Sequence, residues 1–223
     1  GTIPEWTGGL STDAAPLDNG HLTNPFKDEK PEFVITAQNV DQYKDKLTAG
    51  QQAMFKRYPE TYKIRVFPTH RSAAVPDRIY EAAKKSALNT ELVGGGNGVD
   101  NFADSRYYAF PIPKNGLEVV WNHIPRYRGG NVRRTIVQAT PQTNGSYTLV
   151  HFEDEVAFPS DMTDLEPERA KNALLFFKQR VTAPSRLAGN VLLVHDSLDQ
   201  VKEPRQAWIY NAGQRRVRRA PQV

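Results

Sequence analysis

The sequence predicts an α+β fold in which helices cover one face of a strongly curved antiparallel sheet. Segments with helical periodicity gather before residue 130, whereas the chain from Arg133 onward reads as strands joined by short turns. The segment NVLLVH also alternates Val191 and Leu193 with Leu192 and Val194, so it is apolar on both sides. A sheet with one face in water should be apolar on one side only. We therefore expect helices on one face and a second apolar surface on the other.

Residues 1–32 predict an irregular arm. They are rich in Pro, Gly, Asn and Asp and show no hydrophobic periodicity. We expect Trp6 and Phe26 to pin this arm to the rest of the protein. Residues 33–223 are then predicted to form a single folded domain, and no internal repeat divides them.

Helix signals occur in three segments before residue 90, namely residues 36–48, 48–59 and 75–89. Thr36 and Thr48 are suitable N-caps for the first two, and Pro76 suits the first turn of the third. Between the second and third helices, alternating residues predict a strand that ends at Pro68. The glycine-rich residues 92–105 predict a flexible loop.

A fourth helix is predicted over residues 115–127, where the amphipathic spacing is the best in the chain. Leu117, Val120, Trp121 and Ile124 stand at i, i+3, i+4 and i+7. This spacing places all four side chains on one face of the helix. We expect that face to contact the sheet and to line whatever cavity the sheet encloses.

Strands and tight turns make up the rest of the chain. Residues 133–158 predict a hairpin with Asn144 and Gly145 as its turn. Further strands are expected within residues 173–184, 187–198, 206–210 and 215–220, and a helical turn within residues 161–172. Strands that follow one another with short links predict an antiparallel meander.

Composition excludes several classes of site. The chain has no cysteine, which rules out disulfides and thiolate chemistry. Its five histidines are scattered, and none is paired at i+3 or i+4 with another ligand type, so we expect no metal and no cofactor. No run of residues is long and apolar enough to span a bilayer.

Three short motifs resemble catalytic or phosphate-binding signatures. Glu153 and Glu155 share one face of a strand, but such carboxylates are more often solvated or paired with cations on a neighbouring strand. The stretch VHDS joins His195, Asp196 and Ser197, whose side chains point to alternate faces and cannot form a triad. The stretch GGGNG lacks the Lys-Ser/Thr of a phosphate loop. We therefore expect no enzyme; Glu153 with His151 is the best remaining catalytic candidate.

The C-terminal stretch AWIYNAGQRRVRR predicts a strand, a turn and a return strand. Asn211 and Gly213 are residues that tolerate a positive φ, and Trp208 and Tyr210 share one face of the first strand. The arginines of the return strand are Arg215, Arg216, Arg218 and Arg219. The formal net charge is +4, so these four arginines equal the whole basic excess. A nucleic-acid binder spreads its cations over a face or groove, so we expect no nucleic acid and, at most, an anionic lipid surface or an envelope protein as partner.

The same stretch, AWIYNAGQRRVRRAPQV, closely resembles the signature of a bacterial family of outer-membrane lipoprotein-sorting proteins, long labelled a domain of unknown function. The resemblance extends through the segments NPFKDEKPEFVITAQNVDQYKDKLTAGQQAMFKRYP, RVFPTHRSAAVPDRIYEAA, FPIPKNGLEVVWNH and RVTAPSRLAGNVLLVHDSLDQVKEPR. It implies a periplasmic protein whose signal peptide has been removed, with association with the outer membrane as a further option. It also implies an unclosed β-barrel like those of the LolA and LolB lipoprotein carriers. Family members run to roughly twice this length, so the chain is expected to be an N-terminal part.

A half-barrel with an apolar inner face and a helical lid makes a cavity for a hydrophobic chain. We therefore expect a non-catalytic carrier of a lipid, a lipoprotein acyl chain or another hydrophobic molecule. The side chains expected to line the cavity are Leu117, Val120, Trp121, Ile124, Phe177, Trp208 and Tyr210. The alternative is a structural or interaction module of a cell-envelope assembly, in which protein would cover the apolar face.

Overall fold

The computed structural model describes residues 17–18, 21–22, 24–70, 75–102 and 107–221. The chain divides into two compact units, residues 1–74 and residues 75–223. This division lies well beyond the boundary that was predicted after residue 32. Most of the predicted N-terminal arm, including Trp6, falls outside the described residues. Each unit is treated by itself below.

The first unit contains two small strand pairs and two helical segments. Its elements are β1 (Leu17–Asp18), β2 (His21–Leu22), β3 (Phe33–Ile35), the 3-10 helix η1 (Val40–Lys46), α1 (Ala49–Arg57) and β4 (Ile64–Val66). Strand β3 pairs antiparallel with β4, which ends before Pro68 as predicted. Ile35 and Phe55 are buried, and the Phe55 ring meets the Tyr62 ring edge to face at 4.7 Å. These contacts give the unit a small core of its own.

The two N-caps predicted for this unit have different outcomes. Thr48 caps α1, and its side chain and that of Gln51 bond each other's backbone N–H groups in a capping box. The preceding segment is a 3-10 helix that begins after Asn39, so the prediction of a helix starting at Thr36 is wrong. The Asn39 side chain accepts a bond from the Thr36 N–H at 2.7 Å and donates to the Val34 carbonyl at 3.0 Å. These bonds form a turn where a first helical turn was expected.

The second unit begins with two helices and a small hairpin. These are α2 (Asp77–Asn89), β5 (Glu91–Val93), η2 (Gly94–Gly96), β6 (Gly98–Asp100) and α3 (Gly116–His123). Both helices were predicted. The expectation of a flexible loop after residue 92 is wrong over β5 and β6, which pair antiparallel. Three consecutive glycines with positive φ, Gly94 to Gly96, form the turn between them.

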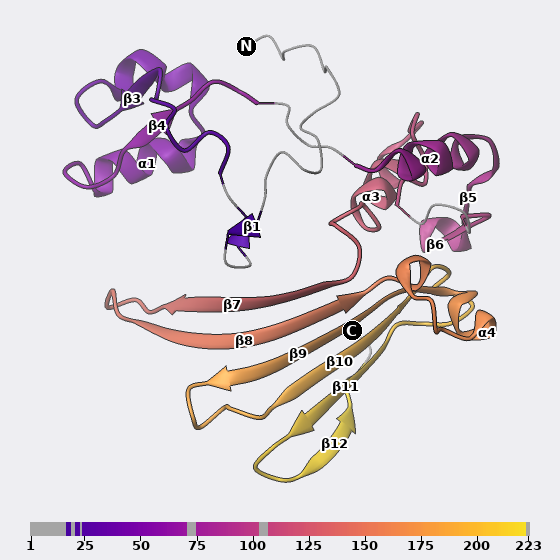
Figure 1. Ribbon diagram of the computed structural model, residues 1–223. Coiled ribbons are helices and arrows are strands. Elements are labelled where there is room, and N and C mark those ends of the chain that lie inside the picture. The colour runs from indigo at the N-terminus through magenta and orange to yellow at the C-terminus, as the bar shows by residue number, and fades with distance from the viewer. Residues whose placement is uncertain (1–16, 19–20, 23, 71–74, 103–106, 222–223) are drawn as a thin grey trace. The chain divides into compact units, whose positions relative to one another are not determined.

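A six-stranded antiparallel sheet forms the rest of the unit (Figure 1). Its strands are β7 (Val132–Pro141), β8 (Tyr147–Ala157), β9 (Ala173–Ala183), β10 (Val191–Ser197), β11 (Gln206–Asn211) and β12 (Arg216–Arg219). They lie in sequence order, with β7 and β12 as the two edges, so the sheet is a meander and is not closed. The 3-10 helix η3 (Pro159–Asp161) and α4 (Pro167–Ala170) connect β8 to β9. An α+β fold with an open antiparallel sheet is thus confirmed.

The helices of this unit pack against one end of the sheet. Trp121 of α3 shares a buried cluster with Leu174 at the start of β9 and Leu198 just after β10. Ile79 of α2 shares another with Phe158, which follows β8. Because these strand residues all lie at the same end, α2 and α3 do not form the lid that was predicted along the face of the sheet.

The predicted inward stripe of α3 is correct for only two of its four residues. Trp121 is 3% exposed, and its Nε1 donates to the Gly96 carbonyl at 2.9 Å; Ile124 packs against the same cluster. Leu117 and Val120 are 50% and 52% exposed. They point away because α3 ends at His123 and meets only the end of the sheet, so just one edge of its apolar stripe is covered.

Candidate functional site

The strand register assigns each side chain of the sheet to one of two faces. Phe176 pairs with His195, and Leu193 pairs with Trp208, so these four side chains lie on one face, here called the cavity face. The neighbouring residues in sequence point the other way. The opposite face, here called the rear face, carries the apolar side chains Phe152, Val156, Phe177, Leu192, Val194 and Ile209.

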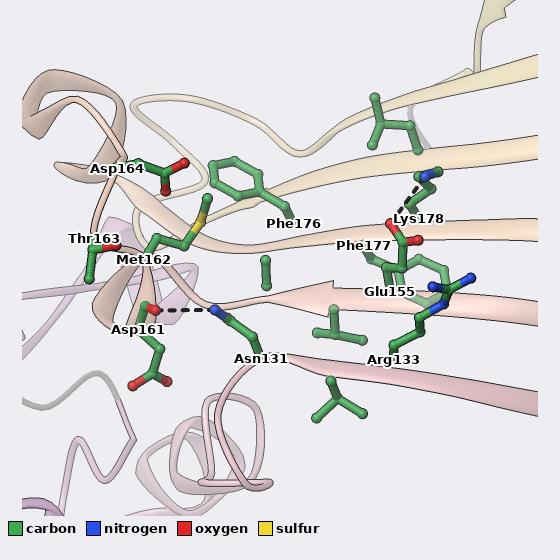
Figure 2. Close-up of a pocket in the computed structure, with 14 residues that line it drawn as sticks. Asn131, Arg133, Glu155, Asp161, Met162, Thr163, Asp164, Phe176, Phe177 and Lys178 are labelled. Atoms are coloured by element: carbon green, nitrogen blue, oxygen red, sulfur yellow. Dashed lines mark hydrogen bonds and ion pairs between the residues drawn. The ribbon is translucent and has the colours of Figure 1, made fainter. Parts of the chain in front are cut away.

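A cavity of about 550 Å³ lies on the cavity face (Figure 2). Its apolar lining includes Phe176 of β9, Leu193 of β10 and Ala157 of β8. The segment from Asp161 to Asp164, which leaves η3, forms part of its rim and contributes the side chain of Met162. The cavity therefore combines a floor built by three strands with a rim built by the β8–β9 connection.

Ion pairs on the same face neutralise the charges beside this floor. Glu155, which lines the cavity, accepts a bond from Lys178 at 3.0 Å. Two residues earlier on β8, Glu153 pairs with Arg180 at 2.7 Å and with Arg133 at 3.6 Å. The hydrogen bond from Arg180 lowers the pKa of Glu153. Glu153 is thus held ionised by cations on neighbouring strands.

The rim of the cavity is tied to the helical end of the unit through Asp161. Its carboxylate accepts bonds from the Tyr107 hydroxyl and from Arg78 of α2, the latter at 3.0 Å. Its carbonyl accepts a bond from the Asn131 side chain at 3.1 Å (Figure 2). Burial, followed by the bond to Asp161, raises the pKa of Tyr107 to about 12, so the hydroxyl keeps its proton as the donor. This set of bonds fixes one side of the opening.

A row of rings continues the apolar floor across the sheet. The ring of His195 lies edge to face between Phe176 and Trp208, with centroids 4.8 and 5.0 Å apart. Burial, reinforced by nearby Arg169, lowers the pKa of His195. The neutral imidazole is therefore favoured, which suits a ring packed between two aromatic side chains.

A second, more polar cavity of about 390 Å³ borders this row. Phe176 and His195 line it together with polar residues of the segment around α4 and Glu203. Asp196 also contributes, but its carboxylate is bound by Arg205 through two bonds of 3.1 and 2.8 Å. Phe176 lines both cavities, so the apolar and polar sites adjoin at this ring.

The rear face has apolar side chains around one buried carboxylate. Asp154 is 1% exposed and accepts bonds from Arg134 at 3.2 Å and from Gln179 at 3.0 Å. The surrounding apolar residues, such as Phe152 and Leu192, are only half-buried. Asp154 points to the face opposite Glu153 and Glu155, which share one face of β8 as predicted.

The structure brings together only some of the seven side chains predicted to line a cavity. Phe177 is among the lining residues, although strand alternation points its side chain to the rear face. Trp208 and Tyr210 lie on the cavity face beyond Leu193, with which Trp208 is paired. The four α3 residues lie at the helical end described above. The prediction missed Phe176, Leu193 and Met162, because the alternation of residues in a single sequence does not show which face of the sheet has a cavity.

The catalytic candidates are accounted for by structural contacts. Glu153 is engaged by two arginines and has a lowered pKa, which makes it a poor general base for its neighbour His151. Asp196 is bound by Arg205 and does not orient His195. Within the part of the chain that the structure describes, no three His, Asp or Glu side chains gather as metal ligands. No described helix is long and apolar enough to cross a membrane.

The C-terminal hairpin has the predicted pairing but a different turn. Trp208 faces Arg219 and Tyr210 faces Val217 across β11 and β12. The positive φ of this turn is at Arg215, with a value of 52°, and not at Asn211 or Gly213 as predicted. Asn211 contributes its side-chain oxygen instead, which accepts a bond from the Gln214 N–H at 2.9 Å. All residues of β12 are exposed.

Comparison with known proteins identifies relatives without a described activity. Residues 34–223 match the family described as a protein of unknown function, DUF1329. The whole chain is 66% identical to the uncharacterized protein PA3922 of Pseudomonas aeruginosa, over 224 aligned residues. The alignment covers 49% of that protein, so the chain spans about half the length of this relative. No solved structure matches the chain.

Proposed function

The chain belongs to the DUF1329 family, and from this premise we propose that its sheet binds a hydrophobic molecule without catalysing a reaction on it. The ligand is a lipid, the acyl chain of a lipoprotein or a molecule of similar apolarity. The observation that carries this proposal is the cavity of about 550 Å³ on the cavity face, with Phe176, Leu193 and Met162 in its lining. Its size lies within the range of small-molecule sites, roughly 300–1,000 Å³.

The energetics favour an apolar ligand. Burying a methylene group gains about 0.8 kcal/mol, so several such groups provide useful affinity with no catalytic or charged partner. The acidic side chains at the edge of the floor are already engaged, since Glu155 is paired with Lys178 and Asp161 with Arg78. A charged substrate would have to compete with these pairs, whereas an apolar chain would not.

A carrier role in the periplasm is part of this proposal. It is supported by the resemblance to lipoprotein-sorting proteins and by the open antiparallel sheet, which suits a barrel left unclosed like those of LolA and LolB. An open sheet is also suited to transfer, because a bulky ligand can enter and leave without the hydrogen bonds between strands being broken.

The test compares two adjacent leucines of β10. Leu193 lies in the cavity, and Leu192 points to the rear face; both are half-buried. We expect organic extracts of the purified protein to contain lipid, and a fluorescent fatty acid to bind and be displaced by unlabelled fatty acid. Leu193→Asn should weaken this binding by about tenfold or more, which corresponds to ~1.4 kcal/mol.

Leu192→Asn is the matched control, because it places the same polar group on the same strand. It should leave fatty-acid affinity within about twofold of the original, while thermal melts of both variants show a comparable change in stability. Absence of any lipid and any fatty-acid binding would refute the proposal. Loss of binding in Leu192→Asn alone would place the ligand on the rear face instead.

A second candidate is an interaction module of a cell-envelope assembly. The observation favouring it is the outward side of α3, where Leu117 and Val120 are exposed although the helix is rich in apolar residues. A helix that is apolar on most sides is normally covered. Fatty-acid binding that is unaffected by Leu193→Asn, together with a stable protein complex lost in Leu117→Asp, would favour this candidate.

A further inference from the structure

The arginines of the C-terminal hairpin differ from the other cations of the sheet in having no acidic partner. Arg133, Lys178 and Arg180 are each paired with a glutamate, and Arg205 is paired with Asp196. In contrast, Arg215, Arg216, Arg218 and Arg219 form no ion pair with any carboxylate of the described residues. Without these four, the 29 basic residues would be 25, equal to the acidic ones. The formal net charge of +4 is thus equal to the charge of these four arginines, which have no acidic partner in the described part of the chain.

The position of the cluster limits the kind of partner that can use it. Strand β12 is an edge of the sheet (Figure 1). Along β12, Arg216 and Arg218 point to one face of the sheet, whereas Val217 and Arg219 point to the other. A partner seated on one face would reach only some of these cations. A flat anionic surface that meets the sheet edge-on can be reached by all of them, because arginine side chains are long and flexible.

Apolar and aromatic side chains accompany the cations. Val217 is 64% exposed and Ile209, which pairs with Arg218 and points to the opposite face of the hairpin, is 46% exposed. Trp208 and Tyr210 stand on the same strand as Ile209 and are only half-buried. Tryptophan and tyrosine favour the headgroup level of a bilayer, and exposed aliphatic side chains favour the region below it.

We propose that the β11–β12 hairpin, residues 206–219, is a docking surface for an anionic lipid membrane. Phosphate groups of the lipids would bind the four arginines, while Val217 and Ile209 would enter the interface between headgroups and acyl chains. This docking goes beyond ligand binding: it would bring a protein that carries a hydrophobic molecule to a surface where such molecules reside. Duplex DNA is a poorer partner, because the rest of the chain adds no net positive charge to follow its backbone.

A simpler role for these charges makes a different prediction. Charged residues on an edge strand prevent it from pairing with the edge of another copy. If this were their only role, replacing them would cause self-association and leave membrane binding unchanged. Lipid binding and oligomeric state must therefore be measured on the same variants.

The experiment is co-sedimentation of the 223-residue chain with vesicles, at about 50 and 300 mM salt. One set contains phosphatidylglycerol mixed with phosphatidylcholine, and the other contains phosphatidylcholine alone. We expect binding to the anionic set only, weakened at high salt because the attraction is screened. The double variant Arg216→Gln/Arg218→Gln should lose about 30-fold in affinity, since each cation near an anionic surface contributes ~1 kcal/mol, or about fivefold.

The matched control removes the same charge elsewhere. Lys56→Gln/Lys63→Gln alters two exposed lysines of the first unit and should change vesicle affinity by less than about twofold. Equal losses in the two double variants would overturn the proposal, because net charge alone would then explain binding. Failure of the original chain to bind anionic vesicles, or arginine-dependent binding to duplex DNA in its place, would overturn it as well. Size-exclusion chromatography of each variant reports whether self-association has changed.

Discussion

The two ends of the sheet are packed very differently, although the same strands run through both. At the helical end, Trp121, Tyr107, Phe158 and Leu174 are almost completely buried. Along the remaining length of the strands, apolar side chains such as Leu193 are only half-buried, and the fully buried side chain is that of a charged residue, Asp154. Hydrophobic burial is the main stabilising term in folding. The helical end therefore supplies stability, whereas the open strands retain apolar surface for a ligand or a partner.

The largest effect is expected from truncation at the helical end. Trp121→Ala removes a buried ring and the bond from its Nε1 to the Gly96 carbonyl, so it should lower the free energy of unfolding by about 3–5 kcal/mol. Leu193→Ala, on the open part of β10, should cost about 1–2 kcal/mol because the leucine is only half-buried. Urea denaturation of the two variants measures both values. Equal costs would mean that the two ends do not differ as described.

The buried carboxylate of the open strands is expected to have the next largest effect. Asp154→Ala leaves Arg134 and Gln179 without their shared acceptor and should cost about 2–3 kcal/mol. The adjacent Glu153→Ala should have a much smaller effect, because the Glu153 side chain is still 31% exposed and its arginine partners are more than half exposed, so solvent screens these pairs. Urea denaturation of both variants gives the comparison. If Glu153→Ala proved the more damaging, the ion pairs of the cavity face would be more important than we infer.

The C-terminal hairpin provides a smaller contrast between packing and charge. Trp208→Ala should cost about 1–2 kcal/mol, because it removes half-buried apolar area and the contact with the His195 ring. Arg216→Ala and Arg218→Ala should change stability by no more than ~0.5 kcal/mol, since both side chains are exposed. Thermal unfolding at one pH separates these outcomes. A large loss of stability from either arginine would show that its side chain packs into the fold.

The smallest expected effect is a pH dependence due to His195. Its pKa is lowered from 6.5 in the folded protein, so between that lower value and 6.5 the unfolded chain binds more protons. Stability should therefore fall as pH falls from about 6.5 through this window. Urea midpoints between pH 8 and pH 5 report this slope, which His195→Gln should reduce. His151→Gln is the control; if it reduced the slope as much, the effect would not belong to the ring row.

Local sequence patterns predicted the elements that depend on neighbouring residues. Thr48 caps its helix, Asn144 and Gly145 join two strands, and the strands from Arg133 onward form a meander, since short links leave few other arrangements. Local sequence patterns failed where contacts between residues far apart in the chain determine the structure. The glycine-rich segment forms a hairpin in which Gly98 bridges Asp199, about one hundred residues away in the chain.

The candidate site was the least predictable part for the same reason. Alternation showed that β10 is apolar on both faces, but it does not say which face has a cavity. That choice depends on the rim between Asp161 and Asp164, which Arg78 and Tyr107 hold in place from outside the sheet. Likewise, the spacing of α3 placed Leu117 and Trp121 on one side, yet only the tryptophan reaches the core.

The most direct test of the binding proposal is photo-crosslinking with a fatty acid that carries a diazirine in its acyl chain. After irradiation, mass spectrometry of proteolytic fragments locates the attached lipid. Our account predicts adducts on the cavity face, at Phe176, Leu193 or Met162, and their suppression by excess unlabelled fatty acid. Adducts confined to the rear face or to the exposed residues of α3, or labelling that unlabelled fatty acid does not suppress, would contradict it.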